Sequence, residues 1–339
     1  MRRSRLTAFF ASTEARLAVI ALVVFVAMAL LSPDRFLSAQ NLTSMAFQFP
    51  EFAILALAMT LTMLTGGIDL SVVGIANLSA IVAATILTQL AGPAATGMDA
   101  ALWLGLSMIA AMGVGLAAGL FNGIAIAVFG LPPILATLGS GLIFTGIAVA
   151  LTGGSAVMGF PAAAAWLGNG LVLGIPVPLI LFAVLAAGLS FILTRTGFGL
   201  KVQMFGANPL AARFAAINVT SVLIRVYLLS GMFAAIAGMV VMSRANSAKA
   251  DYGSSYLLLA VLIAVLGGVD PYGGYGRVIG VVLAVLAMQF LSSGLNMLQV
   301  SNFARELIWG TLLIFVMLVN TRPIVRLWLR KRPRPVPNS

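Results

Sequence analysis

The residues that could do chemistry in this chain are few, and the clearest are two carboxylates that each follow a pair of glycines. The segment TGGIDLS (65–71) lies between two apolar runs, and LGGVDPY (266–272) repeats its Gly-Gly-x-Asp pattern. Because a carboxylate at a helix break can accept hydrogen bonds from free amides of the following helix, we expect both segments to be breaks capped by the aspartate. The residues assigned to these breaks are Gly66, Gly67, Asp69, Gly267, Gly268 and Asp270.

Most enzymatic chemistry is excluded by the residue types that the chain lacks. It contains no His and no Cys, which excludes imidazole acid–base work, thiol nucleophiles, disulfides and the usual zinc sites. None of its lysines follows a glycine, so the GxxxxGK[ST] phosphate loop is absent. We therefore predict no catalytic residue, no metal site and no cofactor, and any ATP hydrolysis must be carried out by a partner.

The acidic residues are scattered along the chain and form no pair within an apolar span. We expect all eight at or near span ends: Glu14, Asp34, Glu51, Asp69, Asp99, Asp251, Asp270 and Glu306. A carrier driven by protons or sodium usually has an ionisable or carbonyl-lined site near the membrane midplane. This pattern disfavours a secondary carrier, which stays open as an alternative of another class, and it disfavours a membrane enzyme.

The elements that must position these residues are membrane spans. Of the 339 residues 61% are hydrophobic and 8% are charged, and the mean hydropathy of +1.12 is far above that of soluble domains. The apolar runs are continuous and do not alternate, which indicates helices and not barrel strands. We predict an all-α polytopic membrane protein with about ten spans, near 17–31, 42–64, 71–90, 100–129, 132–151, 176–194, 219–243, 256–269, 276–294 and 304–320. The fourth is too long for one straight crossing and the eighth is short, so we expect broken or re-entrant pieces.

The formal net charge of +11 could indicate a nucleic-acid partner, but the basic residues gather at the two chain ends and in the loop 195–218, without interleaved aromatic residues. The positive-inside rule explains them better, so we predict no nucleic-acid partner and both termini in the cytoplasm. These termini are the segment 1–16 and the basic tail 321–339, on either side of a transmembrane domain over 17–320. The start MRRSR lacks a following cleavage site, so we expect an uncleaved first span.

The two Gly-Gly-x-Asp segments also suggest that the chain has internally duplicated halves. Each runs from an apolar helix into the glycines and the aspartate and then into a helix rich in small residues. Duplicated halves with broken helices at matching positions are a recurrent transporter design. With ten spans the two copies run in the same direction, whereas one miscounted re-entrant piece would make them inverted.

Small and polar residues mark two further spans. In GVGLAAGLFNG (113–123), glycines at intervals of four form a stripe that suits either packing within one chain or a role at a subunit interface or transport path. Asn122, within this stripe, should form a hydrogen bond to another helix, because an unpaired amide is costly in hydrocarbon. In LPPILATLGSGLIFTG (131–146), Thr137 could line a polar path or could bond to its own helix carbonyls.

The basic loop between two spans contains a short helix. Asn208 before Pro209 resembles an N-cap followed by a first-turn proline, so PLAARFAAI (209–217) should be helical with Leu210, Phe214 and Ile217 on one face. This helix could rest on lipid headgroups, or it could dock on a cytoplasmic partner.

Four motifs follow one another along the chain: LTGGIDLSVVG (64–74), GLFNGIAIAVFGLPPILATLGSGLIFTG (119–146), GANPLAARFAAINV (206–219) and AVLGGVDPYGGYGRVIG (264–280). In this order they resemble the membrane permease subunit of bacterial ABC importers of the ribose, xylose and galactose type, and the resemblance covers nearly the whole chain. The sequence departs from the family where Val73 precedes Gly74 and where VDPYGGYG replaces a Thr/Ser-rich stretch. With the extended loop 155–180, these departures favour the branch of rhamnose-type and autoinducer-2 permeases.

The resemblance implies a complex in the bacterial inner membrane. Two permease subunits, alike or paralogous, would form the path, two cytoplasmic ABC ATPase subunits would drive it, and a periplasmic sugar-binding protein would deliver a monosaccharide, a related small polyol or autoinducer 2. The loop 195–218 would hold the coupling helix that contacts the ATPase, through Gly206, Asn208, Pro209, Ala212 and Arg213. The path residues that we predict on this basis are Asn77, Asn122, Thr137 and Asn296.

Overall fold

The computed structural model describes residues 13–320 of the chain. Its helices are α2 (Thr13–Leu31), α3 (Pro33–Phe36), α4 (Ala39–Met63), α5 (Val72–Ile86) with the π-helical turn η1 (Leu87–Ala91), α6 (Gly97–Ala127), α7 (Pro133–Thr152), the 3-10 turn η2 (Ala162–Ala165), α8 (Trp166–Asn169), α9 (Val177–Arg195), α10 (Gly197–Ala207), α11 (Pro209–Phe214), α12 (Val219–Ala245), α13 (Tyr256–Leu266), α14 (Val278–Met297) and α15 (Asn302–Asn320). Two antiparallel pairs of short strands are present, β1 (Val157–Met158) with β4 (Ser247–Ala248) and β2 (Leu171–Val172) with β3 (Ile175–Pro176).

The helices confirm an all-α polytopic membrane protein. Within residues 13–320, eight helices are long and apolar enough to cross a membrane: α2, α4, α5 with η1, α6, α7, α9, α12 and α14. The short apolar helix α13 and the 19-residue α15 bring the set to ten, and each of the ten overlaps one predicted span. The predicted N-terminal segment lies partly, and the basic tail 321–339 wholly, outside the described residues.

Broken or re-entrant pieces were expected at the fourth and eighth predicted spans, and the structure shows an irregular stretch only beside the eighth. The fourth span is a single continuous helix, α6, whose 31 residues extend about 46 Å, so the prediction of a break there was wrong. Three of its glycines, Gly115, Gly119 and Gly123, pack against α12 within the continuous helix. The eighth span is short, as expected, since α13 has 11 residues and follows the non-helical stretch 246–255 apart from strand β4.

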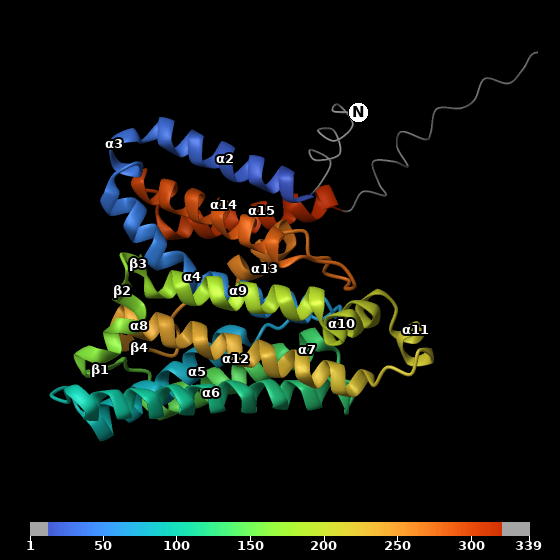
Figure 1. Ribbon diagram of the computed structural model, residues 1–339, viewed down its shortest axis with the longest axis horizontal. Helices are drawn as coiled ribbons and strands as arrows, with labels where there is room; N and C mark the ends of the chain where they lie inside the picture. The colour runs from blue at the N-terminus through green and yellow to red at the C-terminus, as the bar shows by residue number, and fades with distance from the viewer. Residues whose placement is uncertain (1–12, 321–339) are drawn as a thin grey trace, which may run out of the picture.

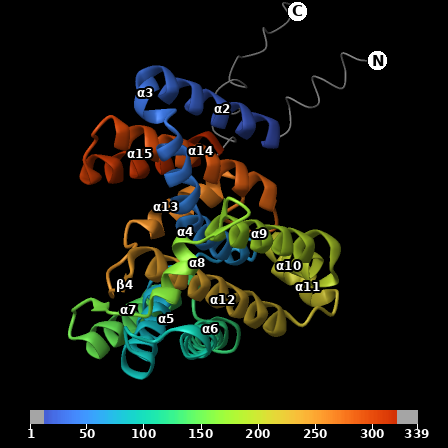
Figure 2. The same ribbon diagram turned by 60° about the vertical axis from the view of Figure 1, so that its left-hand side comes forward.

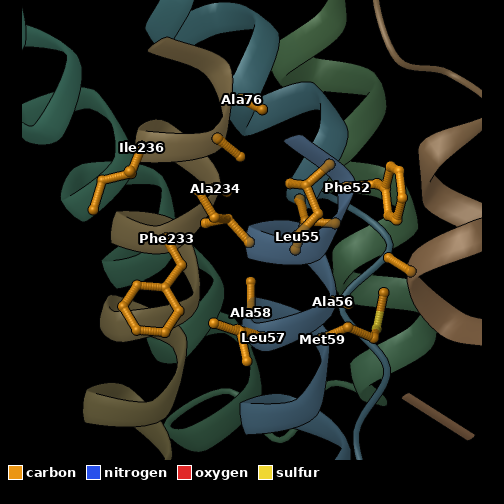
Figure 3. Close-up of a cluster of buried hydrophobic side chains, with 14 of the residues drawn as sticks. Phe52, Leu55, Ala56, Leu57, Ala58, Met59, Ala76, Phe233, Ala234 and Ile236 are labelled. Carbon is orange, nitrogen blue, oxygen red and sulfur yellow. The ribbon is translucent and has the colours of Figure 1, made fainter. Parts of the chain in front are cut away.

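The central helix of the bundle is α4, which is packed on α5, α9, α12, α13 and α14. Figure 3 shows its side chains Phe52, Leu55, Leu57 and Met59 among those of α12 and α5. A helix that is apolar on all sides suits such a surrounded position. Figure 2 shows α5, α6 and α7 on one side of α4 and α12, and α2, α14 and α15 on the other.

The outer helices turn large apolar side chains away from the chain. Leu30 on α2, Ile109 on α6, Leu142 on α7 and Phe191 on α9 are each more than 60% exposed. In water such a surface would favour aggregation, whereas in a membrane it faces lipid or a second subunit.

The bundle has two distinct ends (Figure 1). The α11 end carries α10, α11 and the two Gly-Gly-x-Asp segments, and the β end carries α3, α8 and the strands. Arg16, Arg195, Lys201, Arg213 and Arg277 belong to elements at the α11 end, and Arg35, Arg244, Lys249 and Arg305 to elements at the β end.

The two Gly-Gly-x-Asp segments lie side by side at the α11 end. The amide of Gly274 donates a hydrogen bond of 2.9 Å to the carbonyl of Leu64. Both α4 and α13 lead into this end, and both α5 and α14 lead away from it. The two copies therefore run in the same direction, as the ten-span count predicted; the duplication of whole halves stays a prediction.

Candidate functional site

The predicted coupling segment forms a short helix at the surface, α11. Asn208 caps it, because its Oδ1 accepts hydrogen bonds from the amides of Leu210 and Ala211 at 3.0 Å each. Pro209 occupies the first turn, where its missing N–H costs no hydrogen bond. Arg213 is exposed, and so are Leu210 (63%) and Phe214 (84%). The helix thus presents a cation and two large apolar groups that the rest of the described chain leaves uncovered.

One residue fixes α11 to the bundle. Ala212 is 1% exposed and packs with Ile126, Phe205, Leu223 and Tyr227. The methyl group lies on the face opposite the exposed residues, so the helix cannot rotate without opening this cluster.

The third expected member of the exposed face, Ile217, lies elsewhere. The helix ends at Phe214, and Ala216 has a positive φ of 56°, which reverses the chain. Ile217 then donates its amide to the carbonyl of Ala212 and packs against buried side chains. The prediction that it shares the face of Leu210 was wrong because an unforeseen left-handed residue shortens the helix.

The backbone contacts of Gly206 join α11 to both Gly-Gly-x-Asp segments. A Cβ at Gly206 would overlap the carbonyl oxygen of Leu64 and the amide nitrogen of Gly274. A residue other than glycine would therefore push three backbone segments apart. Movement of α10 and α11 would be transmitted directly to the end of α4 and to the loop between α13 and α14.

Asp69 is the centre of a buried polar network at the first of these segments. Its Oδ1 accepts hydrogen bonds from the amide (3.0 Å) and the hydroxyl (2.6 Å) of Ser71, the residue before α5. Its Oδ2 accepts from the hydroxyl of Ser230, which lies about 16 Å along α12. Asn122 on α6 extends the network by donating to the Ser71 hydroxyl at 2.8 Å. Asp69 thus fixes the start of α5 to α12 and, through Ser71, to α6.

Thr137 holds the same segment to α7. Its hydroxyl accepts a hydrogen bond from the amide of Leu70 and lies 2.8 Å from the carbonyl of Pro133, to which it can donate. Both Thr137 and Asn122 are fully buried in this chain. In the conformation described they connect helices and do not face an open passage.

The prediction that each aspartate caps the following helix was wrong, because Asp69 bonds to Ser71, which precedes α5, and no side chain caps the start of α5 in the described structure. Asp270 forms a turn of its own. Its Oδ1 accepts from the amide of Tyr272 at 2.9 Å, which closes a turn, and it is exposed. The next helix, α14, begins only at Val278, so Asp270 does not cap it. More residues lie between Asp270 and α14 than between Asp69 and α5, where Ser71 directly precedes the helix. The positive φ angle belongs to the first glycine of the first pair, Gly66 (76°), but to the second glycine of the second pair, Gly268 (82°), so the two pairs do not match position by position.

The other two predicted path residues lie apart from this network. Asn77 is buried on α5, and its Nδ2 donates to the carbonyl of Ala250 at 2.8 Å. Asn296 is exposed near the end of α14. The four predicted path residues therefore do not form one site: Asn122 and Thr137 meet near Asp69, and Asn77 and Asn296 do not join them.

An ion pair inside the bundle was not predicted from the sequence. Glu51, expected near a span end, is the thirteenth of the 25 residues of α4 and is 2% exposed. It accepts hydrogen bonds from the Nε of Arg244 on α12 and from the hydroxyl of Tyr256 (2.7 Å) on α13. The signal was present, since a carboxylate lies within an apolar run after Pro50, but its partners are about 200 residues away in sequence.

The glycine stripe of α6 is used within this chain. A Cβ at Gly119 would overlap the Tyr227 carbonyl, and a Cβ at Gly115 would overlap the backbone of Gly231, both on α12. Of the two uses left open by the sequence, the structure shows packing of α6 against α12.

Comparison with known proteins gives the family. A family described as "Branched-chain amino acid transport system / permease component" matches residues 41–319, from α4 to α15. The chain belongs to this family. It is a permease component of a transport system.

Its relatives carry the names of import permeases. The autoinducer 2 import system permease protein LsrD of Enterobacter sp. (strain 638) is 35% identical over 302 residues, which cover 87% of this chain and 89% of the relative. The ribose import permease protein RbsC of Escherichia coli (strain K12) is 32% identical over 308 residues, covering 90% and 92%. RbsC of Bacillus subtilis (strain 168) is 34% identical over 302 residues, covering 88% and 90%. The resemblance to sugar-importer permeases with an autoinducer-2 branch is thus confirmed. No solved structure matches the chain.

Proposed function

We propose that this chain is the permease subunit of an ATP-binding-cassette importer and, with a second permease copy or paralogue, forms the path of a monosaccharide or related small polyol across the inner membrane. The observation that carries this proposal is α11. It is capped and anchored by its own chain, yet it leaves Leu210, Arg213 and Phe214 uncovered. Such a face suits a groove on a partner protein.

The contacts of α11 also explain how a motor could act on the path. Through Gly206, near the end of α10, the segment contacts the end of α4 and the loop between α13 and α14, and Ala212 ties α11 to α6 and α12. A partner that shifts α11 therefore shifts the central helix of the bundle. A packed bundle of this kind changes between discrete arrangements and does not deform continuously.

The partners follow from the division of labour in such importers. A cytoplasmic ABC ATPase contacts α11, and a periplasmic sugar-binding protein delivers substrate to the opposite, β end. The α11 end is assigned to the cytoplasm, together with both termini, because of the basic residues gathered there. The substrate class comes from the relatives named for ribose and autoinducer 2, which are small polyhydroxylated molecules; autoinducer 2 is the second candidate substrate.

Copurification with the cognate ATPase tests the proposal. The two subunits are coexpressed, and the permease is purified through an affinity tag. We expect the wild-type chain to retain the ATPase, and Arg213→Glu to lose most of it because the exposed cation of α11 is reversed. Arg35→Glu is the matched control, since Arg35 is also exposed but lies at the β end. Equal retention of the ATPase by wild type, Arg213→Glu and Phe214→Ser would contradict the assignment of α11.

A further inference from the structure

A cavity at the β end has the chemistry of a small-molecule site. Its volume is about 400 Å³, and it lies between α4, α13, α14 and α15 near the last turn of α12. This size lies within the range of small-ligand pockets. None of the predicted path residues lines it.

A buried glutamine lines the cavity without a hydrogen-bond partner in the described part of the chain. Gln289 on α14 is only 3% exposed and belongs to the cavity wall. A buried amide is costly unless something accepts and donates hydrogen bonds to it. Since its side chain offers one acceptor oxygen and two N–H donors, its natural complement is a pair of neighbouring hydroxyl groups.

Aromatic rings form another part of the wall. Phe52 and Tyr256 pack edge to face, with ring centroids 5.9 Å apart, and Trp309 is 5% exposed. Rings beside hydrogen-bonding groups suit a ligand that has both C–H faces and hydroxyl edges.

Two cations and two carboxylates lie in or beside the wall of the cavity, Arg244, Arg305, Glu51 and Glu306, so their formal charges balance. Arg244 is paired with Glu51, and Glu306 accepts a hydrogen bond of 2.6 Å from Ser255. A charged ligand would have to displace one of these partners, whereas a neutral one would not. The cavity thus favours an uncharged molecule over an amino acid or a phosphate.

We infer that this cavity binds one uncharged, monosaccharide-sized polyol, with the Gln289 amide holding two hydroxyl groups and Trp309 and Tyr256 covering its apolar face. The inference rests on the proposed function, which supplies the substrate class of monosaccharides and related small polyols. It places a weak substrate site within each permease chain at the end opposite α11, where a delivered substrate first reaches the bundle.

Direct binding to the purified permease tests this site. The chain is placed in lipid nanodiscs free of glycoside detergents, whose sugar headgroups would compete, and ligands are added one at a time while binding is followed by saturation-transfer NMR. The probes are ribose, xylose, galactose, rhamnose and autoinducer 2, with leucine as a zwitterionic comparison. We expect weak saturable binding of at least one polyol and none of leucine.

The variants are chosen so that folding and binding separate. Gln289→Met keeps the length of the side chain and leaves no protein group unpaired, so its Tm should not fall, while polyol affinity should drop about tenfold. Gln40→Leu, at an exposed position on α4 outside the cavity, should bind as wild type does. Trp309→Ala should also weaken binding.

Two results would overturn the inference: unchanged polyol affinity in Gln289→Met, or no binding of any of these polyols by the wild-type chain. Neither would remove the proposed function, which is read separately from ATP-dependent uptake by the complete complex. If the complete wild-type complex showed no ATP-dependent uptake, that result would instead contradict the proposed function.

Discussion

Replacing Asp69 separates the structural role of its carboxylate from a role of its charge. Asp69→Leu removes the acceptor of three hydrogen bonds, two from Ser71 and one from Ser230. The Ser230 hydroxyl can turn to a carbonyl of its own helix, whereas the Ser71 amide has no alternative in the described structure. At about 1–3 kcal/mol for each buried group left unpaired, the two groups of Ser71 account for about 2–6 kcal/mol of lost stability.

Asp69→Asn should be much milder. Its side-chain oxygen can still accept both hydrogen bonds from Ser71, and its NH₂ group can donate to the Ser230 hydroxyl, which then turns its own proton elsewhere. We expect a cost of at most about 1 kcal/mol, corresponding to one neutral hydrogen bond. The leucine variant should give less folded protein.

The assay combines the yield and melting temperature of purified protein with substrate uptake in cells. We expect near wild-type uptake for Asp69→Asn, and reduced folded protein with a lower Tm for Asp69→Leu. Asp270→Leu is the control, because Asp270 is exposed and its side chain accepts a hydrogen bond from the amide of Tyr272 at the surface, so the change should alter Tm little. Normal folding of Asp69→Asn with abolished uptake would refute this reasoning and show that the negative charge itself is required.

The remaining predictions concern packing inside the bundle. Gly119→Leu should strongly destabilise the protein because its side chain would push α6 away from Tyr227 of α12, whereas Gly113→Leu on the same helix, with open space around it, should have little effect on Tm. Glu51→Leu should lower Tm by leaving Arg244 without its acidic partner, at a cost below the about 3–5 kcal/mol of a fully buried pair because Arg244 is one-third exposed. Glu51→Gln, which can still accept a hydrogen bond, should lie between wild type and Glu51→Leu.

Local sequence signals predicted much of the fold. Continuous apolar runs located all ten helices, and Asn208 followed by Pro209 located the start of α11. Such signals depend only on residues that are adjacent in the sequence, so they can be recognised in a single sequence. The two Gly-Gly-x-Asp segments were correctly placed between helices for the same reason.

Contacts between distant residues could not be predicted in this way. Apolar composition does not tell a lipid-facing helix from a central one, because lipid and protein interior are both apolar, so the central place of α4 was not foreseen. The pairing of Glu51 with Arg244 and the meeting of Gly206 with Leu64 depend on how helices pack. The same holds for the predicted path residues, whose polar groups were recognised but whose partners were not.

Uptake by proteoliposomes tests the central claim most directly. The permease is reconstituted with its ATPase and binding protein, and accumulation of labelled substrate is measured with ATP, without ATP, and with Arg213→Glu in place of the wild-type chain. We expect uptake that needs ATP and the binding protein and that falls sharply in the Arg213 variant. Uptake by this chain alone, without ATP and driven by an ion gradient, would contradict it.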